Sequence, residues 1–271
     1  MNTNRAVQPF LKWAGGKGQL LEQYFPFLPT TIGTYYEPFL GGGALFFHLQ
    51  PQRAVLSDIN PELVNAYCCI RDRVEEVIAL LDEHQKRHCR DYYYQVRSIV
   101  GKDAISQAAR LIYLNKTCYN GLYQENQKGM FNVPVGRYKN PTICNPERLR
   151  SVSHVLQSVT ISCSSFEAIL TSTLTGEDFV YFDPPYHPIS STSRFTSYSR
   201  YSFSAQDQIH LRDVFTKLAC QGVQVTLSNS DTSFVRELYQ EFPIHTITAA
   251  RAINSRATKR GPISELLITS Y

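Results

Sequence analysis

Short apolar runs alternate along the chain with longer stretches in which apolar residues recur every three or four positions. Short runs of this kind are typical of buried strands, and the longer periodic stretches are typical of helices that cover a sheet. Strands are predicted at 34–39, 53–57, 179–182, 223–227, 244–248 and 265–269. Helices are predicted from just after Gly43 through Leu49, from Pro61 to about Glu83, and at about 205–219. This alternation favours an α/β fold with a mostly parallel sheet.

The middle of the chain, about 61–145, follows a helical pattern and then becomes rich in loops, with no clear strand of its own. An insertion between two halves of one α/β domain explains this pattern better than two consecutive domains. We therefore expect 1–60 and 145–271 to form one domain and 61–144 to form a second unit inserted into it. Residues 187–204 hold nine Ser or Thr in 18 positions and predict a mobile loop.

Composition excludes several classes of protein. No apolar run approaches the roughly 18 residues needed to cross a bilayer, and the first seven residues lack the apolar core of a signal peptide. The seven cysteines include no Cys-x-x-Cys pair, and the seven histidines show no metal-ligand spacing. The sequence therefore predicts a soluble, cytosolic protein with reduced thiols, no metal and no membrane partner.

Charge is distributed unevenly along the 271 residues. The chain has a formal net charge of +4, yet 84–150 alone carries 12 Lys or Arg against four acidic residues. The same stretch holds seven of the 17 tyrosines. A basic segment interleaved with aromatics, within an otherwise acidic chain, indicates a nucleic-acid surface, although a solvated helical face would also account for the charge.

The first chemical motif is a glycine turn between a strand and a helix, running from Glu37 through Phe39 to Gly41 and Gly43. Glycines at such a turn allow the backbone to approach a nucleotide-like ligand. Asp58 ends the next strand, where a carboxylate can accept hydrogen bonds from both ribose hydroxyls. Because the motif is not Gly-x-Gly-x-x-Gly, a phosphate-free adenosine ligand is favoured over a dinucleotide.

A second motif, from Phe10 to Lys17, superficially resembles a phosphate-binding loop. The loop would need Gly at position 11 and Ser or Thr at position 18, where the sequence has Leu11 and Gly18, so an NTPase is excluded. Trp13 could instead pack on an adenine ring while Lys17 meets a carboxylate. A tryptophan buried beside a tight turn for structural reasons is an equal alternative for this motif alone.

The third motif is the most specific: Asp183, Pro184, Pro185 and Tyr186 directly follow an apolar strand. An exocyclic amine is a poor nucleophile because its lone pair is delocalised into the ring. A carboxylate and a carbonyl fixed by consecutive prolines can accept both amine hydrogens and localise that lone pair. The aromatic residue can stack on a base that has left the duplex.

With these three motifs in this order, the sequence resembles the Dam-like DNA adenine-N6 methyltransferases. The resemblance extends from Phe10 to about Leu267, and Asn115–Tyr138 resembles the target-recognition segment of the family. It implies a Rossmann-like methyltransferase domain, S-adenosylmethionine as cofactor and double-stranded DNA as partner. The insertion, 61–144, would be the target-recognition domain, and Phe195–Tyr198 matches a loop expected over a flipped adenine.

The resemblance implies roles for individual residues. Cofactor contacts are expected at Trp13, Lys17, Asp58 and Asp183, together with Glu37, Phe39, Gly41 and Gly43 of the glycine turn. Catalysis is expected at Asp183, Pro184, Pro185 and Tyr186. DNA contacts are expected at Lys12, Tyr119, Asn120, Leu122, Gln124, Pro134 and Arg137.

One position departs from the family. Gln124 stands where the family commonly has Arg, the usual bidentate partner of guanine O6 and N7, whereas Gln suits adenine or a looser contact. The expected target is therefore GATC or a related short palindrome, with the outer base pair in question.

Alternatives remain open at this point. Cytosine-N4 or RNA-adenine transfer shares the amine chemistry, and a non-catalytic DNA-binding protein could retain the cofactor pocket. A nicotinamide dehydrogenase fits less well, and cytosine-C5 transfer lacks the required Pro-Cys pair. We expect a monomer, with a cognate restriction enzyme as a separate partner where one exists.

Overall fold

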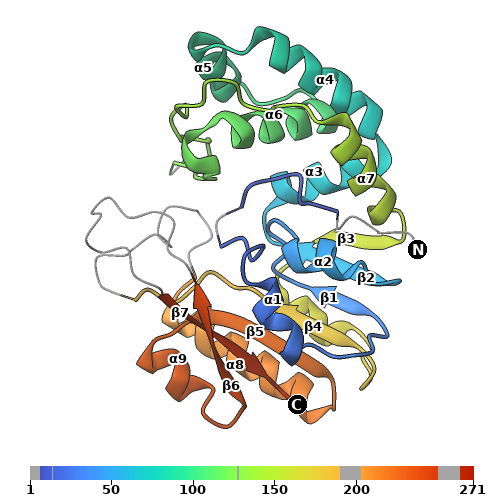
Figure 1. Ribbon diagram of the computed structural model, residues 1–271, viewed down its shortest axis with the longest axis vertical. Coiled ribbons are helices and arrows are strands. Elements are labelled where there is room, and N and C mark those ends of the chain that lie inside the picture. The colour runs from blue at the N-terminus through green and yellow to red at the C-terminus, as the bar shows by residue number, and fades with distance from the viewer. Residues whose placement is uncertain (1–6, 14, 127, 190–202, 250–262) are drawn as a thin grey trace.

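The computed structural model describes residues 7–13, 15–126, 128–189, 203–249 and 263–271 (Figure 1). Most of the loop predicted at 187–204, including Phe195–Tyr198, lies outside the described residues. The chain forms two lobes, one built on a sheet and one built of helices, with α3 and α7 running between them (Figure 1). No helix in the described ranges is long and apolar enough to cross a membrane.

A seven-stranded sheet carries the larger lobe, with strand order β3-β2-β1-β4-β5-β7-β6. The strands are β1 (Tyr35–Glu37), β2 (Ala54–Asp58), β3 (Val159–Cys163), β4 (Phe179–Phe182), β5 (Gln224–Ser230), β6 (Ile244–Ala249) and β7 (Ile263–Thr269). β1 to β5 pair in parallel, whereas β7 runs antiparallel to both β5 and β6. This arrangement confirms the α/β fold with a mostly parallel sheet. It adds β3, which the apolar pattern did not predict.

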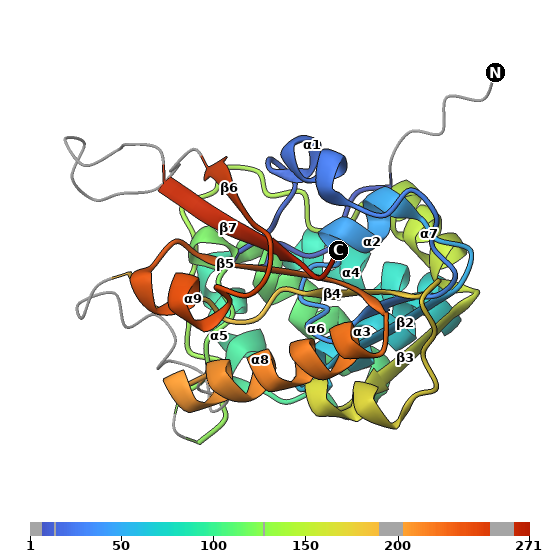
Figure 2. The ribbon, with the colours of Figure 1, turned by 90° about the horizontal axis from the view of Figure 1, so that it is seen from below.

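Helices cover both faces of this sheet. α2 (Ala44–Leu49) and the short α1 (Leu21–Tyr24) lie on one side, and α8 (Ala205–Cys220) lies on the other (Figure 2). Further short helical pieces are η1 (Phe25–Phe27), η3 (Phe166–Thr171) and α9 (Ser233–Leu238). Because both faces are covered, the central strand β4 is buried along its whole length.

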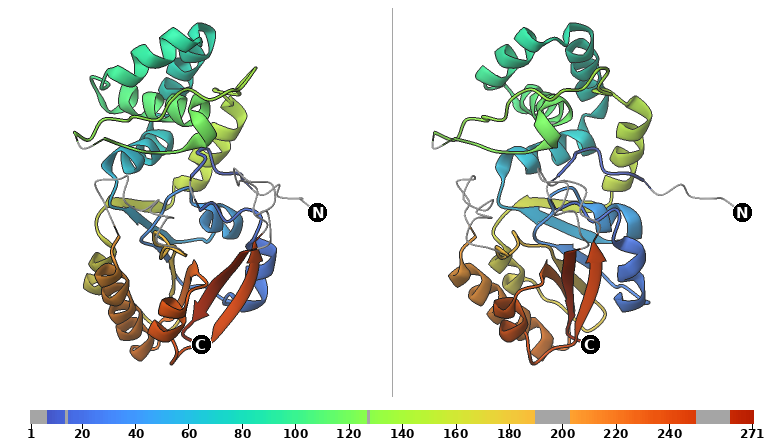
Figure 3. Two further views of the ribbon diagram at one scale, coloured as in Figure 1. Left: turned by 90° about the vertical axis from the view of Figure 1, so that its left-hand side faces the viewer. Right: turned by 60° about the vertical axis from the view of Figure 1, so that its left-hand side comes forward.

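The helical lobe is assembled from α3 (Pro61–Asp72), α4 (Val74–Arg87), α5 (Arg90–Ser98), α6 (Ala104–Thr117), η2 (Tyr119–Gly121) and α7 (Pro146–Leu156). α6 lies at its centre and is buried at most positions from Ala108 to Thr117, with α3, α4 and α5 packed around it (Figure 3). One hydrophobic cluster runs from this helix into the sheet, so the two lobes share a core. A second cluster lies between α8 and the β4, β5 and β7 side of the sheet.

The single helix predicted from Pro61 to about Glu83 is wrong, because two helices occupy this stretch. Arg73 adopts a non-helical backbone conformation (φ −139°, ψ 37°) and separates α3 from α4. The break changes the direction of the chain. Val77 and Leu81 of α4 are thereby fully buried in the helical lobe, where α4 packs on α6. Neither Gly nor Pro marks the break, which is why the apolar period continued through it.

Burial of His84 on α4 makes the helical lobe sensitive to acid. Its ring stacks on Tyr113, its Nδ1 lies 2.8 Å from the Tyr92 hydroxyl, and burial followed by the nearby charge of Arg87 lowers its pKa to about 4. The unfolded chain takes up this proton near pH 6.5 and the folded chain only near 4. Stability that is present above pH 6.5 is therefore lost as the pH falls towards 4, by about 2 kcal/mol after allowance for solvent screening. Urea unfolding across this range should show a flatter pH dependence for His84→Gln; parallel curves would contradict the assignment.

Candidate active site at the carboxyl ends of the central strands

Three carboxylates meet where the strand order reverses. From β1 the chain moves outwards through β2 to β3, and it then returns to β4 on the other side of β1. Glu37 ends β1, Asp58 ends β2, and Asp183 directly follows β4. In open α/β sheets, ligands bind at the carboxyl ends of the strands beside such a switch point. Two of the predicted motifs are thereby placed at one edge of the sheet.

Asp183 is held by two contacts from different parts of the chain. The ammonium of Lys17 lies 2.8 Å from its Oδ1, and the hydroxyl of Ser228 on β5 donates to the same oxygen at 2.8 Å. The side chain of Lys17 is 3% exposed, whereas that of Asp183 is 21% exposed. Oδ2 of Asp183 accepts no hydrogen bond from any residue that the structure describes, so one acceptor oxygen remains available in a fixed place.

The backbone that follows Asp183 is fixed by buried amides. Gln208 on α8 donates from Nε2 to the carbonyl of Pro185 at 2.9 Å, and it accepts a hydrogen bond from Asn229 on β5. Asn229 in turn accepts the backbone N–H of His187. The His187 ring stacks on Phe234, and burial lowers its pKa. The carbonyl of Pro184, in contrast, has no partner within the described ranges.

Tyr186 is held in place at both ends. Its hydroxyl donates to Oε2 of Glu265 on β7 at 2.7 Å, and its ring centre lies 4.6 Å from the ammonium of Lys17. The site residues predicted from sequence did not include Glu265, Ser228, Asn229 or Gln208. A signal for two of them exists: the run Ser228–Ser230 places polar residues at the carboxyl end of an otherwise apolar strand.

Asp58 and the glycine turn form a second, adjoining cluster. The carboxylate accepts the N–H of Gly41 at 3.1 Å and that of Asn60 at 2.9 Å, and burial raises its pKa. Gly41 (φ +46°) is also in contact with the Trp13 indole, which a Cβ at this position would approach to 2.8 Å. Next to Asp58, Ile59 is 47% exposed and offers an apolar surface that the sequence analysis did not single out.

Glu37 is buried and Phe39 is half-buried among aromatic rings. Glu37 is 2% exposed, accepts a hydrogen bond from the Tyr35 hydroxyl at 2.9 Å, and has a pKa raised well above its ordinary value by burial. Phe39 packs among the rings of Phe166, Phe182 and Phe203. Gly43 (φ +63°) directly precedes α2, at a position that favours a residue tolerant of the left-handed region.

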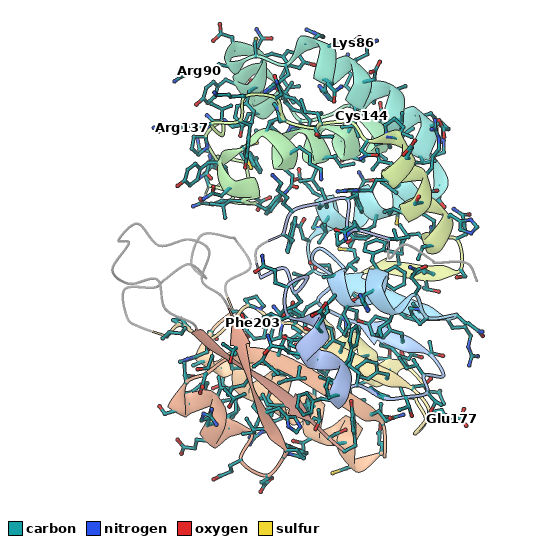
Figure 4. The ribbon with its side chains drawn as sticks, viewed as in Figure 1. Lys86, Arg90, Arg137, Cys144, Glu177 and Phe203 are labelled. Carbon is teal, nitrogen blue, oxygen red and sulfur yellow. The ribbon has the colours of Figure 1, made fainter. Side chains whose placement is uncertain are left out.

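Six of the seven predicted DNA-contact residues lie on two neighbouring segments, and Lys12 lies on the N-terminal stretch. Isolated bridges join Cys118 to Val135 and Glu125 to Phe131, and the N–H of Tyr119 donates to the carbonyl of Pro134. Tyr119 is 49% exposed. Among the predicted residues of these segments, Tyr119, Asn120, Pro134 and Arg137 are exposed, and Leu122 and Gln124 are half-buried. Arg137 projects outwards from the helical lobe (Figure 4).

A cationic cavity of about 420 Å³ lies beside these segments, between the N-terminal residues, α6 and α7. Lys12, Lys116 and Arg148 line it, and no carboxylate does. Burial, followed by the charges of Arg148 and Lys12, lowers the pKa of Lys116 to about 8. Lys12 also lies 4.7 Å from the ring centre of Tyr138. An anion would relieve the mutual repulsion of these charges.

The described residues contain neither a metal-ligand cluster nor a disulfide. No group of three or more His, Cys, Asp or Glu there is arranged to hold a metal ion. All seven cysteines are free thiols.

Comparison with known proteins adds an independent observation. A family model described as D12 class N6 adenine-specific DNA methyltransferase matches residues 13–253. A type II methyltransferase of Lactococcus lactis subsp. cremoris is 45% identical over 273 residues, covering 98% of this chain and 96% of that protein. A type II methyltransferase of Methanocaldococcus jannaschii is 44% identical over 290 residues, covering 98% and 99%. The DNA adenine methylase of Escherichia coli is 36% identical over 271 residues, covering 98% and 95%.

Proposed function

The chain belongs to the D12 class of N6 adenine-specific DNA methyltransferases, and on that basis we propose that it methylates the adenine of GATC, or of a closely related short palindrome, with S-adenosylmethionine as donor. As a member of this class it is an enzyme that acts on DNA, which agrees with the activity predicted from its motifs. The observation that supports the proposal most directly is the anchored Asp183, with its Oδ2 and the Pro184 carbonyl both open.

The residues at the sheet edge fit S-adenosylmethionine. Each oxygen of Asp58 accepts one backbone N–H, which leaves further acceptor positions for two ribose hydroxyls. The exposed Ile59 beside it offers an apolar surface to an adenine ring. Lys17 and Asp183 supply one charge of each sign for the amino-acid end of the donor. When bound, the donor supplies an electrophilic methyl group on a positively charged sulfur.

The active-site residues act on the amine of the substrate adenine. Oδ2 of Asp183 and the carbonyl of Pro184 accept its two hydrogens, because the neighbouring Pro185 carbonyl is occupied by Gln208. These hydrogen bonds draw the nitrogen lone pair out of the ring and direct it at the methyl group. The carboxylate also stabilises the positive charge that develops on the nitrogen. A proton then leaves the nitrogen for solvent, so that no residue has to act as a base before transfer.

Extrusion of the adenine from the duplex is part of the proposal. Tyr186 is oriented by Glu265 and offers its ring as a surface on which the extruded base can stack. Tyr119, at the tip of η2, is exposed and aromatic, and it can enter the space that the base leaves. Asn120, Leu122, Gln124 and Pro134 then face the base edges. We assign this reading function to the insertion, 61–144, and donor binding to 1–60 and 145–271.

Sequencing of native DNA, in a mode that detects modified bases, tests the proposal. The chain is expressed in a methylation-deficient host, with Asp183→Ala as a matched inactive control. We expect adenine-N6 modification confined to one short palindrome and absent in the control. Modified cytosine, or modified adenine without a common context, would overturn the proposed target. A monomer that modifies each strand independently should also leave hemimethylated intermediates in a time course.

The cationic cavity gives a prediction for the salt dependence of DNA binding. Because each neutralised phosphate releases counterions, Lys116→Met and Arg148→Met should each reduce the slope of log affinity against log salt by about 1. Arg150→Met is the matched control, since Arg150 on the same helix is already paired with Glu75 at 2.7 Å. Binding isotherms of a fluorescent duplex at several salt concentrations give the slopes. Equal slopes for all three variants would place the phosphates elsewhere.

A further inference from the structure

A short stretch of chain, here called the strap (Lys12–Lys17), touches the recognition loops at one end and the catalytic carboxylate at the other. Ala14 within it lies outside the described residues. At the far end of the strap, Lys17 forms the ion pair with Asp183. The near end contacts the last turn of α6 and residues just after it, more than 100 positions away in sequence. The strap therefore connects the two parts of the enzyme that have separate tasks.

Asn115 fixes the near end by its side-chain amide. Its Oδ1 accepts the N–H of Lys12 at 2.8 Å, and its Nδ2 donates to the carbonyl of Lys12 at 2.6 Å. The same Nδ2 donates to the carbonyl of Gly121, at 3.1 Å, in the recognition segment. Asn115 is 1% exposed, so these bonds are shielded from water. A Cβ on Gly121 would lie 2.7 Å from the Lys12 side chain, which shows how closely the two segments approach.

Tyr123 makes the second contact, next to the base-reading position Gln124. Its ring stacks on Trp13 with centres 5.3 Å apart and planes inclined by 26°. The Trp13 indole also contacts Gly41, whose N–H is bonded to Asp58. Trp13 thus has contacts with a recognition residue and with the turn that holds the proposed ribose acceptor.

The Tyr123 hydroxyl ties this contact to the first turn of α3. It lies 2.9 Å from Oε2 of Glu62 and 2.7 Å from Oε1 of Glu125. Glu62 stands four residues after Asp58, and Glu125 is 6% exposed. A displacement of the recognition segment on DNA would therefore act on Trp13 through a ring that is held at both its face and its hydroxyl.

We propose that Tyr123 and Asn115 are positioning residues that couple DNA recognition to binding of the methyl donor through the strap. The proposal rests on the donor and DNA sites assigned above. Coupling of this kind is reciprocal: if the cognate duplex tightens donor binding by a certain factor, the donor tightens duplex binding by the same factor. Typical coupling factors lie at about 5–150-fold.

Titration calorimetry with S-adenosylhomocysteine, which permits no turnover, measures this factor with and without the duplex identified by sequencing. For the unmodified protein we expect at least about fivefold coupling. Tyr123→Leu should bring the factor close to 1, whereas Tyr123→Phe, which keeps the stacked ring and loses only the hydroxyl contacts, should give a factor between the two. Tyr94→Leu is the control, because the Tyr94 ring contacts Tyr93 and Arg97 rather than the strap. Tyr123→Met serves if the Leu variant does not fold.

A second readout uses Trp13 itself, which is the only tryptophan of the chain. Its emission should change when the duplex binds to the donor-free protein, and this change should be lost in Tyr123→Leu. A purely structural role of Tyr123 would weaken both affinities and leave their coupling factor unchanged. That result, or an unmodified protein with a factor of 1, would overturn the coupling. Absence of any duplex that binds would instead count against the proposed target.

Discussion

Replacing Asp183 with Asn is expected to slow methyl transfer by about 10³-fold or more, equivalent to about 4 kcal/mol of barrier. The amide keeps the shape of the carboxylate but lacks the charge that stabilises the developing positive nitrogen. It also turns a donor towards the amine if its nitrogen occupies the Oδ2 position. Single-turnover transfer from tritiated S-adenosylmethionine, at saturating donor and duplex, measures the chemical step apart from binding.

Asp183→Asn also destabilises the fold, so its effect on the transfer rate has to be separated from its effect on stability. Lys17 is 3% exposed and would lose its carboxylate partner, a loss that costs about 3–5 kcal/mol in buried pairs. The transfer rate should therefore be measured well below the melting temperature of the variant. Combining Asp183→Asn with Lys17→Met removes the unpaired charge and should recover stability but not activity. Ser228→Ala, which removes one hydrogen bond and leaves the charge, should slow transfer far less. Near-normal rates in folded Asp183→Asn would refute the mechanism.

Introducing Arg at position 124 is expected to sharpen discrimination at the outer base pair of the target. A bidentate contact to guanine O6 and N7 contributes about 1–3 kcal/mol, so the preference for a guanine there should rise by about 5–150-fold. The backbone is already fixed for this role, because the carbonyl of Gln124 accepts the N–H of Asn132 at 3.0 Å. The ratio of kcat/KM on GATC to that on duplexes with a changed outer pair gives the result.

Gln124→Lys is the matched control for this experiment. Lysine adds the same charge without the planar fork of arginine, so it should tighten binding to all duplexes with little gain in discrimination. If Arg and Lys gave equal ratios, the effect would be electrostatic and Gln124 would not face a base. A fall in discrimination with Arg would indicate that the unmodified enzyme reads a different outer base pair.

The fold could be predicted from sequence where burial is complete and not where it is partial. β4 is apolar throughout and was predicted with the bounds that the structure shows, whereas β5 continues three residues past its predicted end because its last residues, Ser228–Ser230, are polar. The edge strand β3, from Val159 to Cys163, mixes apolar residues with Thr and Ser because much of it remains accessible, so its pattern is weak. The break at Arg73 left no sign in the apolar period either. It depends on how α4 packs in three dimensions.

The candidate site also contains residues that could be predicted from sequence and residues that could not. Residues at strand ends, such as Asp58 and Asp183, could be predicted together because parallel strands end at one edge of a sheet. Their supports could not: Gln208 lies on α8 and Glu265 on β7, 23 and 79 positions from the groups they hold. The motif left two roles open for Trp13, packing on an adenine ring or filling the core beside a tight turn, and the sequence contained nothing to pair it with Tyr123. Such pairs exist only once the chain has folded.

The route of the chain between the lobes has a consequence for altering the target of the enzyme. The chain leaves the sheet through α3 and returns to it through α7. These two helices pack on each other, and α3 also packs on both α6 and β3. Neither passage is a flexible linker. A chimaera that exchanges only 61–144 would cut beside helix starts and separate α3 from the surface on which it lies. A graft with a better prospect of folding would carry α3, α6 and α7 as one block, together with the strap residues that contact it.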